Sequence, residues 1–188
     1  MPALKKNQIV DEWSVLIRGI PGKAGYIFGT TGNNIDETNV PDVNVEKSKV
    51  AAGGAFGGLF AAKRDCLIIT NTQNPKLRPY QMFICARDYG NNLDISWYLT
   101  YRLSFRQKVL TFFRALPLIG LLFVGVIDPE NIAKTEVSNL DFFDEQDLRV
   151  YVTNAHKCLQ DAVDKLMLEL NQDPSKIDRK SRGFLGIS

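Results

Sequence analysis

Residues 93–101 constrain the fold more than any other part of this sequence. Apolar side chains take every second position, and mostly polar ones take the positions between: Leu93, Ile95, Trp97, Leu99 and Tyr101 alternate with Asp94, Ser96, Tyr98 and Thr100. Such alternation is typical of a β-strand with one buried face. A strand of this kind needs neighbouring strands and a covering layer, so the chain is expected to build a sheet and bury one face of it.

Apolar runs at 66–70 and 80–85 precede this strand and are separated by the breaker Asn74-Pro-Lys-Leu-Arg-Pro79. The turn residues at 89–92 then indicate a hairpin. Together these features predict a three-stranded antiparallel meander over 65–102 with one buried face. Residues 13–17 also alternate. The short apolar piece 26–28, stopped by the glycine- and asparagine-rich cluster 29–34, is read as part of the strand-rich half.

A long C-terminal helix is the second clear element. Its apolar residues recur at spacings of three and four: Leu148, Val152, Ala155, Leu159, Ala162, Leu166 and Leu170. Asp144 is expected to cap it, with Glu145 and Asp147 in the first turn, and residues 171–174 to end it. The apolar stripe needs a surface to cover, most simply the open face of the sheet. The sequence therefore predicts an α+β fold in which an antiparallel sheet is packed by this helix, with a further apolar helical segment at 103–127.

The whole chain, 1–188, is expected to form one domain, strand-rich over 8–102, helical over 103–171, and ending in a basic and apolar tail at 175–188. A balance of 23 basic and 21 acidic residues gives a net charge of +2, which does not favour nucleic acid as a partner. Cys66, Cys85 and Cys158 are far apart and form no C-x-x-C pair. We therefore expect a cytoplasmic protein without a disulfide framework, although a single bridge between Cys66 and Cys85 stays open.

Catalytic and metal-binding patterns are absent from the sequence. His156 is the only histidine and has no Cys or carboxylate at i+4, so it is expected at the surface or a boundary rather than on a metal. Cys66 and Cys85 lie in apolar strands, where thiols are inert. The glycine-rich stretch 53–58 lacks the G-K-[S/T] of a phosphate loop. We therefore expect no cofactor and no metal, and favour a non-enzymatic role.

Residues 103–127 form the most unusual part of the sequence. A helix over 103–116 places its aromatic and aliphatic residues on one face, and no charged residue occurs between 115 and 127. As a helix, 109–127 measures about 28 Å, close to the ~30 Å hydrocarbon core of a bilayer. Basic residues precede the run, and Asp128 and Glu130 follow it. A buried core element, an interfacial or partner-covered element, and a membrane span all stay open.

The segment 103–127 adds more apolar surface than one small sheet needs, because the C-terminal helix is already expected to cover the open face of that sheet. Our main expectation is a non-enzymatic subunit that docks on a membrane surface or a larger assembly, in the cytoplasm and with membrane association as an option. Two further apolar pieces, 50–62 and the tail, contribute. The expected contact residues are Arg106, Lys108, Val109, Phe112, Phe113, Arg114, Leu118, Phe123, Phe56, Phe60, Phe184 and Leu185.

Two rival functions remain. The first is a small-molecule-binding domain or enzyme with a pocket between sheet and helices, lined by Trp97, Tyr101, Cys85 and His156. The second is a purely structural subunit that forms homo-oligomers. The acidic stretch 128–147 makes self-association feasible, because it can pair with the basic helix of a neighbouring copy.

Overall fold

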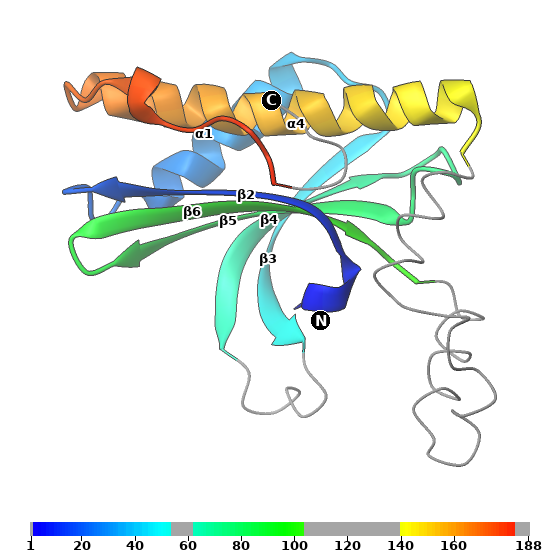
Figure 1. Ribbon diagram of the computed structural model, residues 1–188, viewed down its shortest axis with the longest axis horizontal. Helices are drawn as coiled ribbons and strands as arrows, with labels where there is room; N and C mark the ends of the chain where they lie inside the picture. Colours follow the sequence, from blue (N-terminus) through cyan, green and yellow to red (C-terminus); the bar gives the residue numbers. More distant parts are fainter. Residues whose placement is uncertain (1, 54–61, 104–139, 183–188) are drawn as a thin grey trace, which may run out of the picture.

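The computed structural model describes residues 2–53, 62–103 and 140–182. Within them the chain is α+β, as predicted: a curled, mixed sheet of six strands is covered by two α-helices (Figure 1). The strands are β1 (Ala3–Lys5), β2 (Ile9–Arg18), β3 (Val43–Gly53), β4 (Lys63–Asn71), β5 (Tyr80–Tyr89) and β6 (Asn92–Tyr101). The helices are α1 (Ala24–Glu37) and α4 (Phe142–Glu169), with 3-10 turns at Lys6–Gln8 and Pro174–Lys176.

The strand order is β1-β3-β4-β5-β6-β2. β4, β5 and β6 are antiparallel neighbours in the sheet, and β2 pairs antiparallel with β6 at the far edge. β1, however, pairs parallel with β3 through Ala3–Ala51, Leu4–Ala52 and Lys5–Gly53. The sheet is therefore mixed, which corrects the antiparallel sheet predicted from the sequence.

The N-terminal segment shows why the sheet curls. Lys5 pairs with Gly53 at one edge, and Ile9, four residues later, pairs with Thr100 next to the other edge. Four residues span at most ~14 Å, whereas five strand spacings in a flat sheet require about 24 Å. The edges must therefore approach each other at this end. A Cβ at Gly53 would lie 2.5 Å from Cγ of Lys5, so glycine is what permits the close approach of β1.

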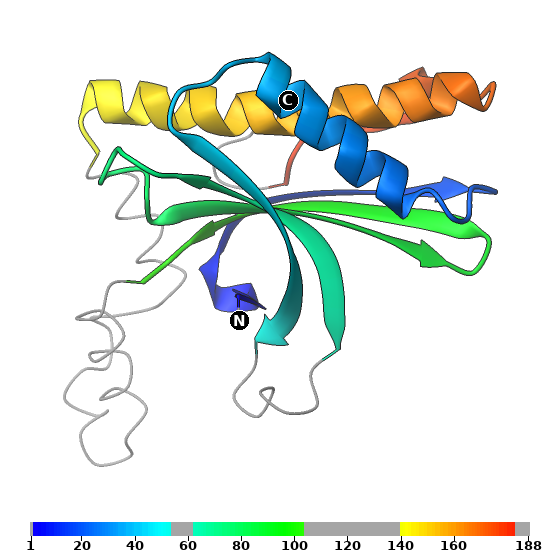
Figure 2. The ribbon, with the colours of Figure 1, turned by 180° about the vertical axis from the view of Figure 1, so that it is seen from behind.

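Both helices lie on the same face of the sheet (Figures 1 and 2). The alternating residues of β6 point to this face, and Leu93, Ile95, Trp97 and Leu99 are fully buried there. The stripe predicted for the C-terminal helix faces them and is buried from Leu148 to Leu166, while Leu170 is exposed. Residues from β2, α1, β4, β5, β6 and α4 thus share one hydrophobic core.

Residues 24–37 correct one sequence interpretation, because they form α1 and not a strand followed by a turn. The pattern that decides the structure is Ile27, Phe28, Thr31 and Ile35, which fall on one helical face and are buried against the sheet. Burial of this stripe outweighs the low helix propensity of Gly29 and Gly32.

The start of α4 also differs from the prediction. The helix begins at Phe142, and its N-cap is Asp141, whose carboxylate accepts a hydrogen bond of 2.9 Å from the backbone N–H of Asp144. Asp144 therefore lies inside the first turn rather than at the cap. This hydrogen bond to the charged form is the main reason that the pKa of Asp141 is lowered.

The second half of α4 is enclosed on both flanks. On one flank α1 crosses it obliquely (Figure 2), and the amide of Asn34 donates to the carbonyl of Cys158 at 3.0 Å. On the other flank the chain after α4 turns back, so that Arg179 forms an ion pair of 2.9 Å with Asp164. The backbone N–H of Arg182 then donates to the carbonyl of Glu12 in β2.

The apolar helical segment expected at 103–127 lies, apart from Leu103, outside the described residues. Among the residues that are described, no helix has both the length and the apolar character needed to cross a bilayer.

Candidate functional site

The twelve contact residues predicted from the sequence lie outside the described part of the chain. They fall in the ranges 54–61, 104–139 and 183–188. The twelve residues are Arg106, Lys108, Val109, Phe112, Phe113, Arg114, Leu118, Phe123, Phe56, Phe60, Phe184 and Leu185. Their grouping into one surface therefore stays a prediction.

The pocket lining proposed for a small-molecule site is wrong. Trp97, Tyr101 and His156 lie on the helix-covered side, where they are packed into the core. Cys85 points to the opposite face and belongs to a separate cluster with Cys66 and Phe83. The alternation of β-strand side chains accounts for the separation, because residues 85 and 97 lie on opposite faces of the sheet.

His156 is a core residue, not a surface or boundary one. Only 1% of it is exposed, and its ring lies between the indoles of Trp13 and Trp97, with centroid distances of 5.5 and 4.8 Å. Burial lowers its pKa to about 4, so the imidazole is neutral at pH 7. In the described residues no cluster of His, Cys, Asp or Glu is arranged to hold a metal ion. His156 thus serves packing.

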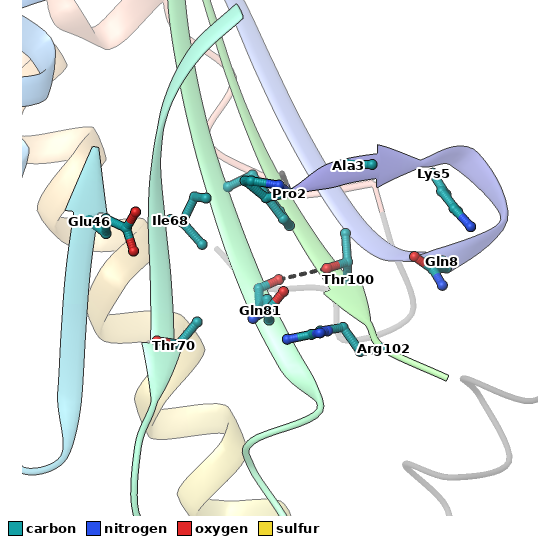
Figure 3. A pocket seen from close by; sticks show the side chains of 11 residues that line it. Pro2, Ala3, Lys5, Gln8, Glu46, Ile68, Thr70, Gln81, Thr100 and Arg102 are labelled. Carbon is teal, nitrogen blue, oxygen red and sulfur yellow. Dashed lines mark hydrogen bonds between the residues drawn. The ribbon is translucent and has the colours of Figure 1, made fainter. Parts of the chain in front are cut away.

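The face of the sheet opposite α1 and α4 carries a cavity of about 450 Å³ (Figure 3). Its floor consists of side chains from β4, β5 and β6, and one wall is the N-terminal segment as it crosses between the sheet edges. The lining residues are Pro2, Ala3, Lys5, Gln8, Glu46, Ile68, Thr70, Gln81, Phe83, Thr100 and Arg102. This cavity therefore depends on the curl of the sheet described above.

A disulfide and a small apolar cluster adjoin this cavity. Cys66 and Cys85 are directly opposite each other on β4 and β5 and form a disulfide bond. Val50, Ile68 and Phe83 pack with it, and Ile68 and Phe83 also line the cavity. The bridge resolves the alternative that the sequence left open. The cytoplasmic location stays a prediction. The bridge weighs against it, because disulfides persist mainly in oxidising compartments.

A second feature lies at the start of α4. Phe142 and Phe143 are 68% and 74% exposed, although the same helix buries its apolar stripe a turn later. Their rings contact each other edge to face, with centroids 5.7 Å apart. Adjacent exposed aromatic rings are unusual on a surface that meets only water, and they are common at contact surfaces.

Acidic residues surround the aromatic pair. Asp141, Asp144, Glu145 and Asp147 lie at the cap and in the first turns of α4. Asp144 pairs with Lys76 at 3.5 Å, and Glu145 pairs with Arg149 at 3.0 Å. Asp141 and Asp147 have no ion pair among the described residues. This end of the helix is therefore a negatively charged surface with an aromatic centre.

Comparison with known proteins adds no functional information. No known protein family matches the chain, and no curated protein matches it in sequence. A solved structure, the crystal structure of TTHA0849 from Thermus thermophilus, is similar with 13% sequence identity over 80% of this chain and 97% of that chain, at a TM-score of 0.25. A likeness of this size carries no argument about fold or function.

Two groups of surface residues were missed by sequence reasoning, for different reasons. The cavity forms from residues far apart in sequence, such as Lys5 and Arg102, and no local pattern predicts that the N-terminal segment bridges the sheet. Phe142 and Phe143, by contrast, carried a local signal: two adjacent aromatic residues stand outside the apolar stripe and beside an acidic first turn.

Proposed function

We propose that the chain is an assembly-docking subunit that associates with a second copy of itself at the acidic and aromatic start of α4. The observation that carries this proposal is the exposure of Phe142 and Phe143, which lie outside the hydrophobic core of the described residues. Neither ring belongs to the buried stripe of α4. Covering them would therefore remove apolar surface from water without disturbing the fold.

The aromatic pair cannot form the whole interface. Two rings of this exposure contribute on the order of 250 Å² of apolar surface, whereas a stable interface needs about 800 Å² from each partner. The sequence supplies further apolar residues earlier in the chain, in the uncharged run 115–127 and the aromatic stretch before it. The expected contact residues Phe112, Phe113, Leu118 and Phe123 are part of this proposal.

Charge favours a protein over a membrane as the partner. The acidic residues around the aromatic pair are repelled by anionic headgroups and attract basic side chains. The chain carries such side chains in Arg106, Lys108 and Arg114. In a symmetric pair, the basic stretch of one copy would meet the acidic helix start of the other.

Sedimentation equilibrium over a range of concentrations tests this function. We expect the wild-type protein to form concentration-dependent oligomers that salt weakens, and the double variant Phe142→Ser/Phe143→Ser to be monomeric under the same conditions. Leu168→Ser is the matched control, because Leu168 is 63% exposed near the other end of the same helix. It should associate like the wild type. A wild-type protein that stays monomeric at every concentration contradicts the proposal.

Flotation with phosphatidylserine-containing vesicles examines the membrane alternative. If the wild-type protein floats with the vesicles and the double variant does not, the aromatic pair docks on lipid, and the proposal of a second copy is wrong. Equal behaviour of the two proteins with vesicles, together with loss of self-association in the double variant, supports the second copy.

A further inference from the structure

We propose that the cavity on the face of the sheet opposite α1 and α4 binds a small amphipathic anion, a single carboxylate or sulfonate attached to an apolar chain or ring. This site is separate from the docking surface. It lies under the curled sheet between β3 and β6, whereas the aromatic pair lies at the start of α4 (Figures 1 and 3). Its volume of about 450 Å³ falls within the range of small-molecule sites.

The apolar part of the ligand has a defined surface to contact. Ile68 and Phe83 are direct cross-strand neighbours on β4 and β5, and both line the cavity. They are continuous with Val50, the disulfide and the partly buried Tyr98 in one apolar cluster. Ile68 is 8% and Phe83 is 2% exposed, so the apolar surface that binding removes from water is chiefly that of the ligand's own chain or ring, and its burial favours binding.

Polar groups follow in the next row of the same face. Thr70, Gln81 and Thr100 are paired across β4, β5 and β6. The Thr100 hydroxyl donates to the Gln81 carbonyl at 3.0 Å. Within the described ranges, the Gln81 side-chain amide and the Thr70 hydroxyl bond to no other protein group, so both are available to hydrogen-bond a ligand headgroup.

The charge at the cavity mouth selects an anion. Arg102 follows β6 directly, and Figure 3 shows its guanidinium extended towards the side of Gln81. In the described part of the chain no carboxylate forms an ion pair with it. Lys5 brings a second positive charge from the N-terminal wall, and its aliphatic stem lies over Gly53. A planar guanidinium binds a carboxylate or sulfonate with two parallel hydrogen bonds.

Glu46 limits how the ligand lies. It lines the cavity from β3, three strands away from Arg102, and it is exposed. A second negative group on the ligand would be repelled from this end. The site is therefore expected to take a single anionic head near Arg102, with an uncharged tail directed along the sheet towards Phe83.

Calorimetric titration of the full-length chain with decanoate, decanol and decylammonium, each below its aggregation concentration, tests the proposal. We expect decanoate to bind, decanol to bind more weakly and decylammonium not to bind. Arg102→Gln should weaken decanoate binding roughly tenfold, because a charge-assisted hydrogen bond is lost. Arg18→Gln is the matched control, since Arg18 is an exposed arginine that does not line the cavity. It should leave the affinity unchanged.

A second variant locates the site independently of charge. Thr70→Trp places a large ring in the cavity and keeps a residue type that strands favour. It should abolish decanoate binding while circular dichroism shows a folded protein. The Phe142→Ser/Phe143→Ser variant should bind decanoate normally, which separates this site from docking. Absence of decanoate binding, equal binding of the three ligands, or equal effects of Arg102→Gln and Arg18→Gln would overturn the inference.

Discussion

The two halves of α4 belong to one helix but meet different surroundings. From Asn154 to Glu169 the helix lies between the sheet, α1 and the returning C-terminal segment, with hydrogen bonds from Asn34 on one flank and Arg179 on the other. Around Phe142 and Phe143 it carries exposed aromatic rings and an excess of acidic residues. The difference indicates that the second half of the helix stabilises the fold, while the first turn presents the two exposed rings on which the proposed docking depends.

The largest expected effect comes from a substitution in the enclosed half. Leu159 is fully buried in the core shared by the sheet and both helices. Leu159→Ala should lower the free energy of unfolding by about 2–5 kcal/mol, because it removes apolar contacts and leaves a cavity. Urea denaturation followed by circular dichroism measures the loss. A decrease in the free energy of unfolding of less than ~1 kcal/mol would mean that Leu159 is not enclosed in the core.

The pH dependence of stability tests the same half through His156. Its folded pKa of about 4 lies below the ordinary value of 6.5, so the unfolded chain binds the proton more readily. The contribution of the neutral, buried imidazole to the free energy of unfolding is fully present above pH 6.5. It decreases by on the order of 3 kcal/mol as the pH falls from 6.5 towards 4. Denaturation at a series of pH values from neutral down to the folded pKa, on the wild type and on His156→Phe, measures it. The free energy of unfolding of the variant should lack the decrease that His156 causes between pH 6.5 and 4. Parallel curves of unfolding free energy against pH for the two proteins would contradict the burial of His156.

A smaller effect is expected at the cap of the exposed end. Asp141→Ala removes the hydrogen bond to the N–H of Asp144 and should reduce helix stability at its first turn. Thermal unfolding should show a lower Tm than the wild type, but a much smaller decrease than Leu159→Ala produces. A loss as large as that of Leu159→Ala would indicate that the start of α4 is part of the core.

The substitution Phe142→Ser/Phe143→Ser should have the smallest effect on stability, within ~0.5 kcal/mol, because both rings are exposed. Denaturant unfolding of the monomeric variant measures it. A clear loss of stability would mean that the rings support the fold, and the contrast between the two halves of the helix would disappear.

Local periodicity explains why much of the fold could be predicted. The alternation at 93–101 and the stripe from Leu148 to Leu166 each record burial on one face, and the structure buries those residues. Residues 26–35 were misread because glycines and polar residues masked a helical stripe that only contact with the sheet reveals. The start of α4 was misplaced by three residues, since Asp141 and Asp144 are both acceptable caps by residue type.

The cavity could not be predicted because it depends on non-local geometry. Two of its charged residues, Lys5 and Arg102, line the same cavity only because the N-terminal segment joins both edges of the sheet. The sequence predicts apolar docking segments, which stay a prediction, but it places the emphasis on 103–127 and passes over Phe142 and Phe143. These two rings are adjacent in sequence and follow no repeating pattern.

Amide hydrogen exchange along α4, measured at low and high protein concentration, tests the central claim most directly. If the start of the helix docks on a second copy, amides in 144–150 should exchange more slowly at high concentration, while those in 154–169 keep the same rates at both concentrations. Identical rates throughout the helix at the two concentrations, or a change confined to 154–169, would contradict the account.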